Sequence, residues 1–432
     1  MRPQNGRSRA VIAMDLNLKK KIEKNFERLS EPLYQIQNIF QRQSYEWYGD
    51  WEGRALLSFV CQFKLTGKKI PCMDLMFGRL PEKTNGYLYF GKPYDGKVAD
   101  EQQLSGHSWY LRALVAYAGA FGSAEALEIA RSTVENLYLP VADKYENYPV
   151  ERDGGQTGGV GGNAYKVQDG WKLSTDVGCA FMPIDGLAHY YAATKDERVA
   201  KLLRTMIGAF MRIDKPKIGM QTHATLSAAR GILECYAATG EEKYLQYAKD
   251  IFALYVSLGM TLNYENFNWF GRPDTWTEPC AVVDSMIVAL KLFRLTGESG
   301  YGTLARRIWF NGLQFCQRFN GGAGTNSCVT AENPVLKINS YEAPFCCTMR
   351  YAEGLLYAAE NSPLLMRDDG GEISKDRYGR IFMGDKLLAE DLSGQTEGER
   401  YTAFGKTLVR IPSLTEYPRA TAENIRLKII FD

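Results

Sequence analysis

One pattern recurs six times along this chain of 432 residues: an apolar helix, an aromatic residue, a short polar turn and a second helix. Within each copy the apolar residues fall at three- and four-residue spacing, which places them on one wide stripe of a helix. The turn often contains Thr-Gly, and glycine suits the left-handed residue that ends many helices. The copies cover residues 53–69, 110–131, 184–204, 228–250, 284–307 and 349–362.

A single copy of this pattern cannot bury its apolar face, so the copies must stack on one another. Six units of inner helix, turn and outer helix are the number that closes into a ring. The sequence therefore predicts a mainly α protein, an (α/α)6 toroid that forms a catalytic domain over about residues 15–365. An open helical solenoid built from the same repeats is the alternative.

The pattern changes after this region. Residues 366–432 show alternating and β-branched residues with proline and glycine between them, which is typical of strands. The sequence predicts a β-rich, sandwich-like C-terminal segment here. A complete sandwich needs more residues, so we expect this segment to be partial or minimal.

Charge and composition exclude several classes of function. A net charge of +2 provides no basic field to attract nucleic acid or anionic lipid. No apolar run is long enough to span a membrane, and the N-terminus lacks a signal-peptide core, so the chain as written is predicted to be cytoplasmic. It would be periplasmic or secreted if a leader had been removed. The 26 tyrosines, 20 phenylalanines and 7 tryptophans suit either stacking on sugar rings or the core of a large helical domain.

Most of the unusual residues fall in the segments that lead into the predicted inner helices. In a toroid these segments line one rim, which we therefore expect to hold the functional site. They are residues 47–54, 105–110, 154–171, 221–226, 263–280 and 339–350. The glycine-rich 154–171 segment is not a P-loop, because it lacks the Gly-Lys-Ser/Thr ending.

Nine cysteines, an odd and scattered number, do not resemble a disulfide framework. Cys280 lies two residues after Glu278, and Cys346 and Cys347 are adjacent. Three thiolates and a carboxylate form a plausible tetrahedral set for zinc, and the two motifs enter neighbouring inner helices. The alternative is three buried free cysteines and a surface glutamate, since the spacing is not that of a structural C-x2-C site.

Two stretches resemble glycoside hydrolase family 127, the β-L-arabinofuranosidases. They are YENFNWFGRPDTWTEPCA (264–281) and APFCCTMRYAEGLLY (343–357), and LVRIPSLTEYP (408–418) resembles the start of that family's β-domain. The resemblance covers about residues 25–365. It implies an (α/α)6 barrel with β-sandwich domains behind it, and a retaining, exo-acting hydrolase that releases a terminal β-L-arabinofuranose or related pentose.

The same resemblance implies roles for individual residues. Zn²⁺ would be held by Glu278, Cys280, Cys346 and Cys347, with Cys346 as the nucleophile and Glu265 as the acid/base. A free thiol titrates near ~8.5 and needs a metal or a helix N-terminus to become a thiolate at neutral pH. Glu265 stands among aromatic residues, and such surroundings raise a carboxyl pKa and keep its proton available.

Substrate contacts are expected from residues of the same rim. His107 and His223 stand at inner-helix entrances, where the family binds sugar hydroxyls with histidines; a structural role is the alternative. Asp176 lies where the family has a further sugar-binding histidine, and this departure leaves the sugar open. Trp269 and Asp274 complete the predicted substrate contacts.

Three smaller questions stay open at this point. Asp274 and Arg272 could position Glu265 or simply pair with each other. Asp50, Glu52 and Arg54 form either a rim ion-pair cluster or a pocket wall. His189 lies in the middle of a predicted helix and is assigned to the core.

The expected partner is an oligosaccharide or glycoside, with a homodimer left open. Two alternatives belong to other classes of function. The first is a non-catalytic carbohydrate-binding toroid, which would have no use for paired thiols beside a carboxylate. The second is an (α/α)6 lyase or epimerase, which needs a site centred on Tyr, His or Arg and fits poorly with three histidines.

Overall fold

The computed structural model describes residues 16–41, 46–151 and 164–366, together with the backbone of six strands that follow. The chain is mainly helical, as predicted. Its principal helices are α1 (Leu16–Ser30), α2 (Ile36–Ile39), α3 (Asp50–Thr66), α4 (Met73–Gly78), α5 (Leu80–Lys83), α6 (Glu101–Phe121), α7 (Ala124–Thr133), α8 (Pro183–Thr194), α9 (Glu197–Arg212), α10 (Thr222–Thr239), α11 (Glu242–Leu258), α12 (Pro279–Thr296), α13 (Ser299–Ile308), α14 (Gln314–Cys316), α15 (Met349–Glu360) and α16 (Ser362–Leu365).

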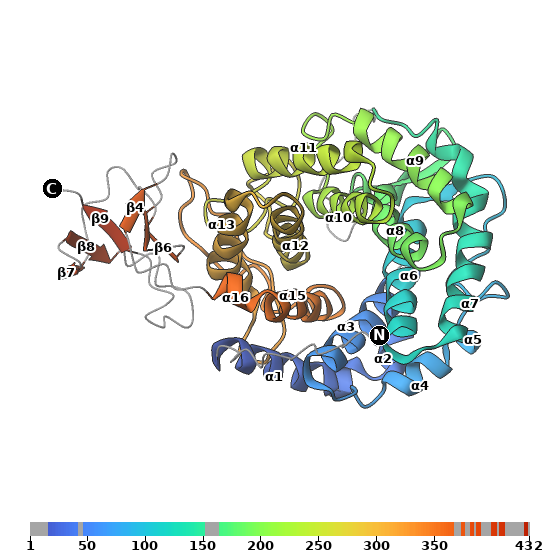
Figure 1. The fold of residues 1–432 in the computed structure, drawn as a ribbon, viewed down its shortest axis with the longest axis horizontal. Coiled ribbons are helices and arrows are strands. Elements are labelled where there is room, and N and C mark those ends of the chain that lie inside the picture. Colours follow the sequence, from blue (N-terminus) through green and yellow to red (C-terminus); the bar gives the residue numbers. More distant parts are fainter. Residues whose placement is uncertain are drawn as a thin grey trace, which may run out of the picture.

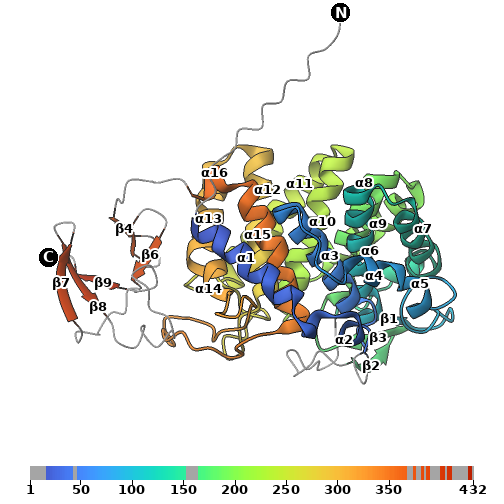
Figure 2. The same cartoon turned by 90° about the horizontal axis from the view of Figure 1, so that it is seen from below.

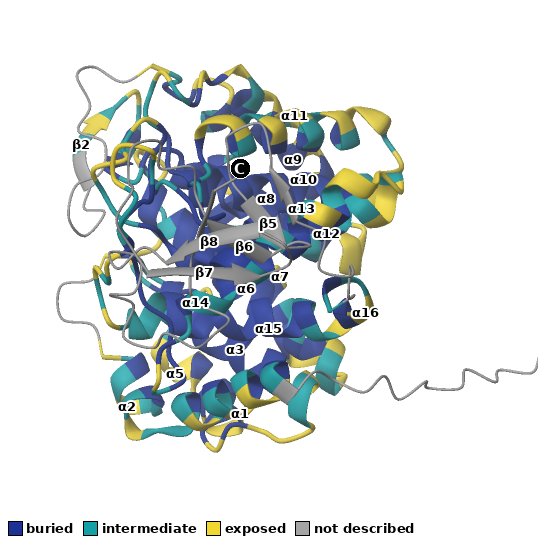
Figure 3. Ribbon diagram, turned by 90° about the vertical axis from the view of Figure 1, so that its left-hand side faces the viewer, coloured by how far each residue is buried: buried dark blue, intermediate teal, exposed yellow. Residues whose placement is uncertain are grey.

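Six inner helices form a closed ring (Figure 1). In chain order they are α3, α6, α8, α10, α12 and α15; each packs against the next, and α15 packs back against α3. The prediction of an (α/α)6 toroid is confirmed, and the open solenoid is excluded. Figure 3 shows that buried residues concentrate in the inner helices, while exposed residues lie mostly on the outer helices and the loops.

The outer layer follows the predicted repeat in the middle of the chain and departs from it at the ends. Helices α7, α9, α11 and α13 each follow and pack against the inner helix before them. After α3 and α15, however, only the short helices α4, α5 and α16 follow. The N-terminal helix α1 packs against both α15 and α3, so it supplies outer cover where the ring closes (Figure 2).

Glycines end several inner helices as the Thr-Gly turns predicted. Gly67, Gly240 and Gly297 have φ values of 71°, 72° and 72°, and each donates its N–H to the carbonyl four residues earlier. Other glycines allow inner helices to touch. A Cβ on Gly53 would lie 2.2 Å from the backbone nitrogen of Tyr110 on α6.

Short strands accompany the helices. A sheet of order β1-β3-β2 lies at the entrance rim, with β1 (Ala99–Asp100) before α6 and β2 (Ala164–Gln168) and β3 (Trp171–Ser174) before α8. Two antiparallel sheets follow α16, in the region where strands were predicted. They are β4 (Ile373–Lys375), β5 (Ile381–Met383) and β6 (Lys386–Ala389), and β7 (Glu399–Ala403), β8 (Lys406–Arg410) and β9 (Leu427–Ile430).

The boundary between domains 15–365 and 366–432 stays a prediction, although α16 ends at Leu365. Most of the glycine-rich segment, residues 152–163, lies outside the described residues. Over the described part of the chain, no helix combines the length and apolar character needed to cross a bilayer.

Candidate metal centre

Three cysteine thiols meet where the α12 and α15 inner helices begin. Cys280 occupies the first turn of α12, and Cys346 and Cys347 lie in the π-helical turn η6 (Pro344–Thr348) that leads into α15. The Cys280 sulfur is 3.4 Å from that of Cys346 and 3.8 Å from that of Cys347, and the adjacent pair is separated by 3.8 Å. The packing of α12 against α15 brings these residues together across about 65 positions of sequence.

Glu278 is the residue that precedes α12, and two asparagines hold it in place. Its Oε1 atom lies 3.8 Å from the Cys346 sulfur. Its backbone N–H donates to Asn266 Oδ1 at 2.7 Å. Asn268, in the amide orientation that satisfies its neighbours, donates to Glu278 Oε2 at 2.9 Å and accepts from the Trp276 indole. The carboxylate is therefore fixed beside the thiols.

These residues fit a zinc ion. Sulfur atoms at ~2.3 Å from a tetrahedral metal lie about 3.8 Å from one another, and the observed separations of 3.4–3.8 Å are close to that spacing. The ligand atoms of Cys280, Cys346 and Cys347 lie within 4.8 Å of one another, as do those of His223, Glu278 and Cys280. The cluster could therefore hold a metal ion.

The electrostatics single out Cys346 among the three thiols. Hydrogen bonds from Cys280 and Cys347 lower the pKa of Cys346 well below its usual range, and the Arg54 charge adds to this effect. Burial raises the pKa of Cys280. Cys346 is also the only one of the nine cysteines that is partly exposed. A thiolate at Cys346 is therefore both stabilised and accessible.

Arg54 connects this cluster to the start of α3. Its Nη1 atom donates to the Cys280 sulfur at 3.4 Å, and its Nε donates to Asp50 Oδ1 at 2.7 Å. The guanidinium also lies 4.4 Å from the centre of the Trp109 ring. Asp50 and Arg54 are thus a buried ion pair beside Cys280. The sequence had left open whether Asp50, Glu52 and Arg54 form an ion-pair cluster or a pocket wall.

The two predicted sugar-binding histidines are held by protein groups. The Nδ1 atom of His223 lies 3.0 Å from Glu278 Oε1, its Nε2 lies 3.5 Å from Asp284 Oδ2, and its ring stacks on Trp109. His107 is fully buried. Its Nε2 accepts from the Phe90 N–H at 2.9 Å, and its Nδ1 lies 2.7 Å from the Gln103 carbonyl oxygen. A contact of either histidine with substrate stays a prediction.

Asp176 stands close enough to this centre to interact with it electrostatically. It precedes the short helix η4 (Cys179–Phe181) and is partly buried. Burial raises the pKa of its carboxyl group to about 8, and the charges of Glu278 and Cys346 contribute to the rise. The side chain is therefore a neutral acid near pH 7.

Glu265 has a different environment from the one its aromatic neighbours in sequence suggested. It is fully buried, and its carboxylate accepts hydrogen bonds from Asn263 Nδ2 at 2.7 Å and from Asn326 Nδ2 at 2.6 Å. The Cys316 thiol lies 3.8 Å from its Oε1. Amide donors therefore hold both oxygens, and the acid/base role stays a prediction.

The remaining predicted contacts, Trp269 and Asp274, both have protein partners. Trp269 is buried and packs edge-on against Trp276, with ring centres 5.5 Å apart. Asp274 is exposed and forms an ion pair with Arg272 at 2.8 Å. Asp274 and Arg272 therefore pair with each other, and contacts of Trp269 and Asp274 with substrate stay predictions.

Sequence reasoning missed the asparagines that hold Glu278. Asn266 and Asn268 lie in the NYENFNW run, where every second or third residue is an asparagine. Such a density of amide side chains directly before a metal-ligand motif is a signal that could have identified them. No feature of the neighbouring sequence indicated a role for Asp284, which lies within an apolar helix.

Comparison with known proteins was made at the levels of sequence and fold. No family of known sequences and no curated protein matches the chain. The match is one of fold. An α-mannanase of glycoside hydrolase family 76 from Bacteroides thetaiotaomicron superimposes with a TM-score of 0.52 at 13% identity, covering 81% of this chain and 96% of its own. An unsaturated glucuronyl hydrolase specific for heparin gives 0.52 at 12% identity, covering 81% and 99%.

A β-arabinofuranosidase of glycoside hydrolase family 127 also aligns, with a TM-score of 0.49 at 15% identity over 93% of this chain. The chain spans 62% of that protein's length. At such identities the comparisons show a shared helical toroid and nothing finer. Any activity must be argued from the site itself.

Proposed function

We propose that this chain is a retaining, exo-acting glycoside hydrolase that releases a terminal β-L-arabinofuranose or related pentose from an oligosaccharide or glycoside. One observation carries the proposal: three thiols and the Glu278 carboxylate gather at the entrance rim, with Cys346 stabilised as a thiolate and partly exposed. The motifs resembling family 127 supply the sugar class.

The centre would hold Zn²⁺ through Glu278, Cys280, Cys346 and Cys347. When bound, the ion would keep the coordinating thiols deprotonated at neutral pH. The chain's own groups contribute to the same end without it. Arg54 donates to Cys280, and the first turns of two inner helices meet at the thiols.

Two displacements account for retention of configuration. The Cys346 thiolate attacks the anomeric carbon, and the bond to the leaving-group oxygen breaks as a carboxylic acid gives that oxygen a proton. In the second step the resulting carboxylate takes a proton from water. The water oxygen then attacks the anomeric carbon, and the thiolate leaves. The protein regains its starting protonation state.

Two carboxyl groups are candidates for the acid. Glu265 is the one that the family resemblance implies. Asp176 is the alternative, because its electrostatic environment includes Glu278 and Cys346, whereas Glu265 is bonded to two asparagines. Comparison of variants at the two positions, described in the Discussion, distinguishes them.

The primary test is metal content followed by a screen of aryl pentofuranosides. Purified chain should carry about one zinc, and Cys347→Ser should lose it, because a thiolate ligand is removed. Cys61→Ser is the matched control, since Cys61 is a buried cysteine of α3. Reduced protein that gains no zinc on incubation would contradict the centre. Sugar binding without turnover would indicate the non-catalytic alternative.

A further inference from the structure

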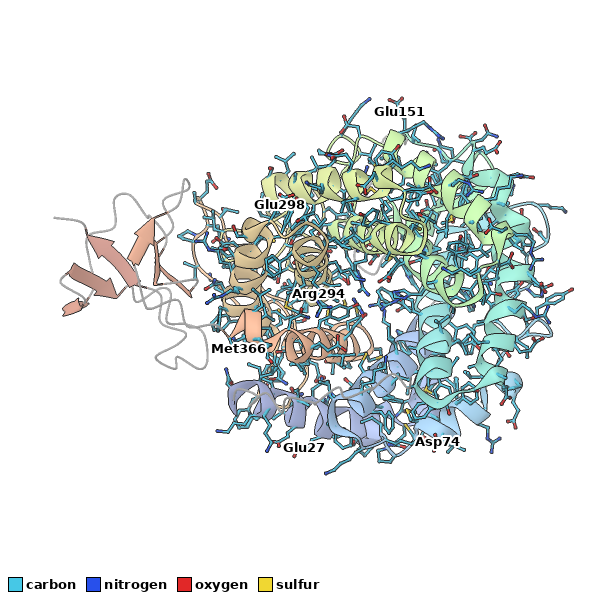
Figure 4. All side chains as sticks on the ribbon, in the orientation of Figure 1. Glu27, Asp74, Glu151, Arg294, Glu298 and Met366 are labelled. Atoms are coloured by element: carbon cyan, nitrogen blue, oxygen red, sulfur yellow. The ribbon has the colours of Figure 1, made fainter. Side chains whose placement is uncertain are left out.

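A buried cluster of charged residues is connected to the metal centre through His223. Side chains of the inner helices point toward the centre of the ring (Figure 4). Six charged residues from five of these helices, each at most 6% exposed, are joined to one another by ion pairs. They are Arg112 of α6, Asp185 of α8, Arg230 of α10, Asp284 of α12, and Arg350 and Glu353 of α15.

The charges in this cluster balance, with three cations and three anions. Asp284 is bonded by both Arg230 and Arg350. Glu353 accepts from Arg230 at 2.7 Å. Because a buried charge is costly unless it is paired, each partner confines the other, and the side chain of Asp284 has little freedom.

His223 is the connection between this cluster and the thiols. Its Nε2 faces Asp284 at 3.5 Å, and its Nδ1 faces Glu278 at 3.0 Å. Trp109 covers one face of the ring, with ring centres 5.7 Å apart. The imidazole is only 2% exposed. Both ring nitrogens therefore lie near carboxylates of the protein, Nδ1 within hydrogen-bonding distance of Glu278 and Nε2 near Asp284 without a hydrogen bond.

We propose that His223 is a positioning residue of the metal centre: the imidazole, stacked on Trp109 and facing Asp284, holds the Glu278 carboxylate beside the three thiols. This inference rests on the proposed function, because it assigns a role toward the zinc that Glu278 would bind. It gives His223 a role other than the expected sugar contact. Partners of metal ligands typically contribute 10- to 100-fold to affinity, because they fix the orientation of the ligand.

The molecule contains a matched control. His189 lies in the same relation to the charge cluster, with its Nε2 at 3.5 Å from Asp185 Oδ1. Its second neighbour is Glu234, at 3.8 Å, rather than a residue of the metal centre. Substitution of His189 therefore disturbs a histidine–aspartate contact of similar geometry without removing a contact to the thiol site.

The experiment measures zinc affinity on the full-length protein by competition with a chromogenic chelator. His223→Ala should weaken zinc binding by about 10- to 100-fold, and His189→Ala should leave it within about twofold. Glu278→Ala should weaken it more than either, since it removes a ligand. Thermal unfolding of each variant establishes that it is folded.

Two isosteric substitutions separate the ring nitrogens. The amide nitrogen of asparagine can take the place of Nδ1, and that of glutamine the place of Nε2. His223→Asn should therefore retain more zinc affinity than His223→Gln, because only the first preserves the contact with Glu278.

The outcomes distinguish the two proposals. If wild-type protein binds zinc but His223→Ala binds it equally well, or His189→Ala weakens it as much, the inference is overturned and the metal centre stands. A loss as large as that of Glu278→Ala would make His223 a ligand and also overturn the positioning role. Wild-type protein without affinity for zinc would overturn both.

Discussion

At the scale of single residues, the nine cysteines of this chain have different environments, and these set the pKa values of their thiols. Burial raises the pKa of Cys72 to about 11 and that of Cys235 to about 12, and it also raises the pKa of Cys316. Cys346 departs in the opposite direction because two thiols donate hydrogen bonds to it. Reactivity should therefore concentrate on one sulfur.

Alkylation tests this contrast. Reduced, metal-free protein treated with iodoacetamide at pH 7 should be modified at Cys346, because the lowered pKa leaves its thiolate populated where the other thiols are protonated. Peptide mass spectrometry locates the label. Cys346→Ala should lose turnover by a factor on the order of 10⁴ or more while still binding sugar. Modification mainly at Cys72 or Cys316 with activity retained would contradict the nucleophile.

The residue that acts as the acid can be identified from how the rate of each variant depends on the leaving group. Removing the proton donor should cripple hydrolysis of natural glycosides and only modestly slow an aryl glycoside with an acidic phenol, which departs with little protonation. The two variants to compare are Glu265→Gln and Asp176→Asn. The variant whose rate falls much more for natural glycosides than for the aryl glycoside identifies the acid. Added azide should rescue the second step of the reaction in that variant. If Glu265→Gln slows all substrates equally, Glu265 is a positioning residue of the asparagine-rich loop.

At the scale of elements, the first helix supports the cysteine pair from a distance in sequence. Arg28 at the end of α1 donates to both oxygens of Glu342, at 3.0 and 2.8 Å. Thr348 donates to the same carboxylate at 2.8 Å. Although burial opposes it, these hydrogen bonds lower the pKa of Glu342, so this carboxylate stays ionised and is unsuited to proton donation. Glu342 instead ties α1 to the turn that carries Cys346 and Cys347.

Close contacts between inner helices yield an element-scale prediction. Gly53→Ala should destabilise the protein by about 1–3 kcal/mol or more, because the added Cβ would meet the Tyr110 backbone at 2.2 Å and force α3 from α6. Gly208→Ala in α9, where no atom lies within 4 Å, should instead stabilise by about 0.5–1 kcal/mol. Denaturant unfolding measures both. Equal effects would mean that helix propensity outweighs the close packing.

At the scale of the whole molecule, the ring is held partly by ion pairs that join helices across its axis. Burial opposes ionisation of Asp284, but Arg230 and Arg350 lower its pKa from 3.8 to about 2. A carboxyl whose pKa is lower in the folded state contributes stability above its unfolded pKa and loses that contribution as pH falls through the folded value.

This linkage predicts the course of acid unfolding. The free energy of unfolding, measured in urea at a series of pH values, should fall between about pH 4 and pH 2 as Asp284 becomes protonated. Asp284→Asn should be less stable at pH 7 and should show a shallower decline in that range. Glu125→Gln, a substitution at an exposed residue in the first turn of α7, is the control. An unchanged slope in Asp284→Asn would show that other carboxyls govern the transition.

The sequence by itself determined the helical toroid, the strands after it, and the three cysteines and one glutamate that meet where α12 and α15 begin. Apolar spacing and glycine caps are local properties, and six repeats of one hairpin leave few ways to bury their faces. The adjacency of Cys280 and the cysteine pair followed from the order of the inner helices.

Only the tertiary structure decided which partner each polar side chain takes. The place of α1 beside α15, the hydrogen bond from Asn326 to Glu265 and the two carboxylates beside His223 join segments far apart in the chain. Periodicity carries no record of such contacts, since a hydrogen bond depends on ångström-scale distances set by ring closure. For that reason His107 and His223, which were expected at the substrate because they stand at inner-helix entrances, are held by protein groups in the folded chain.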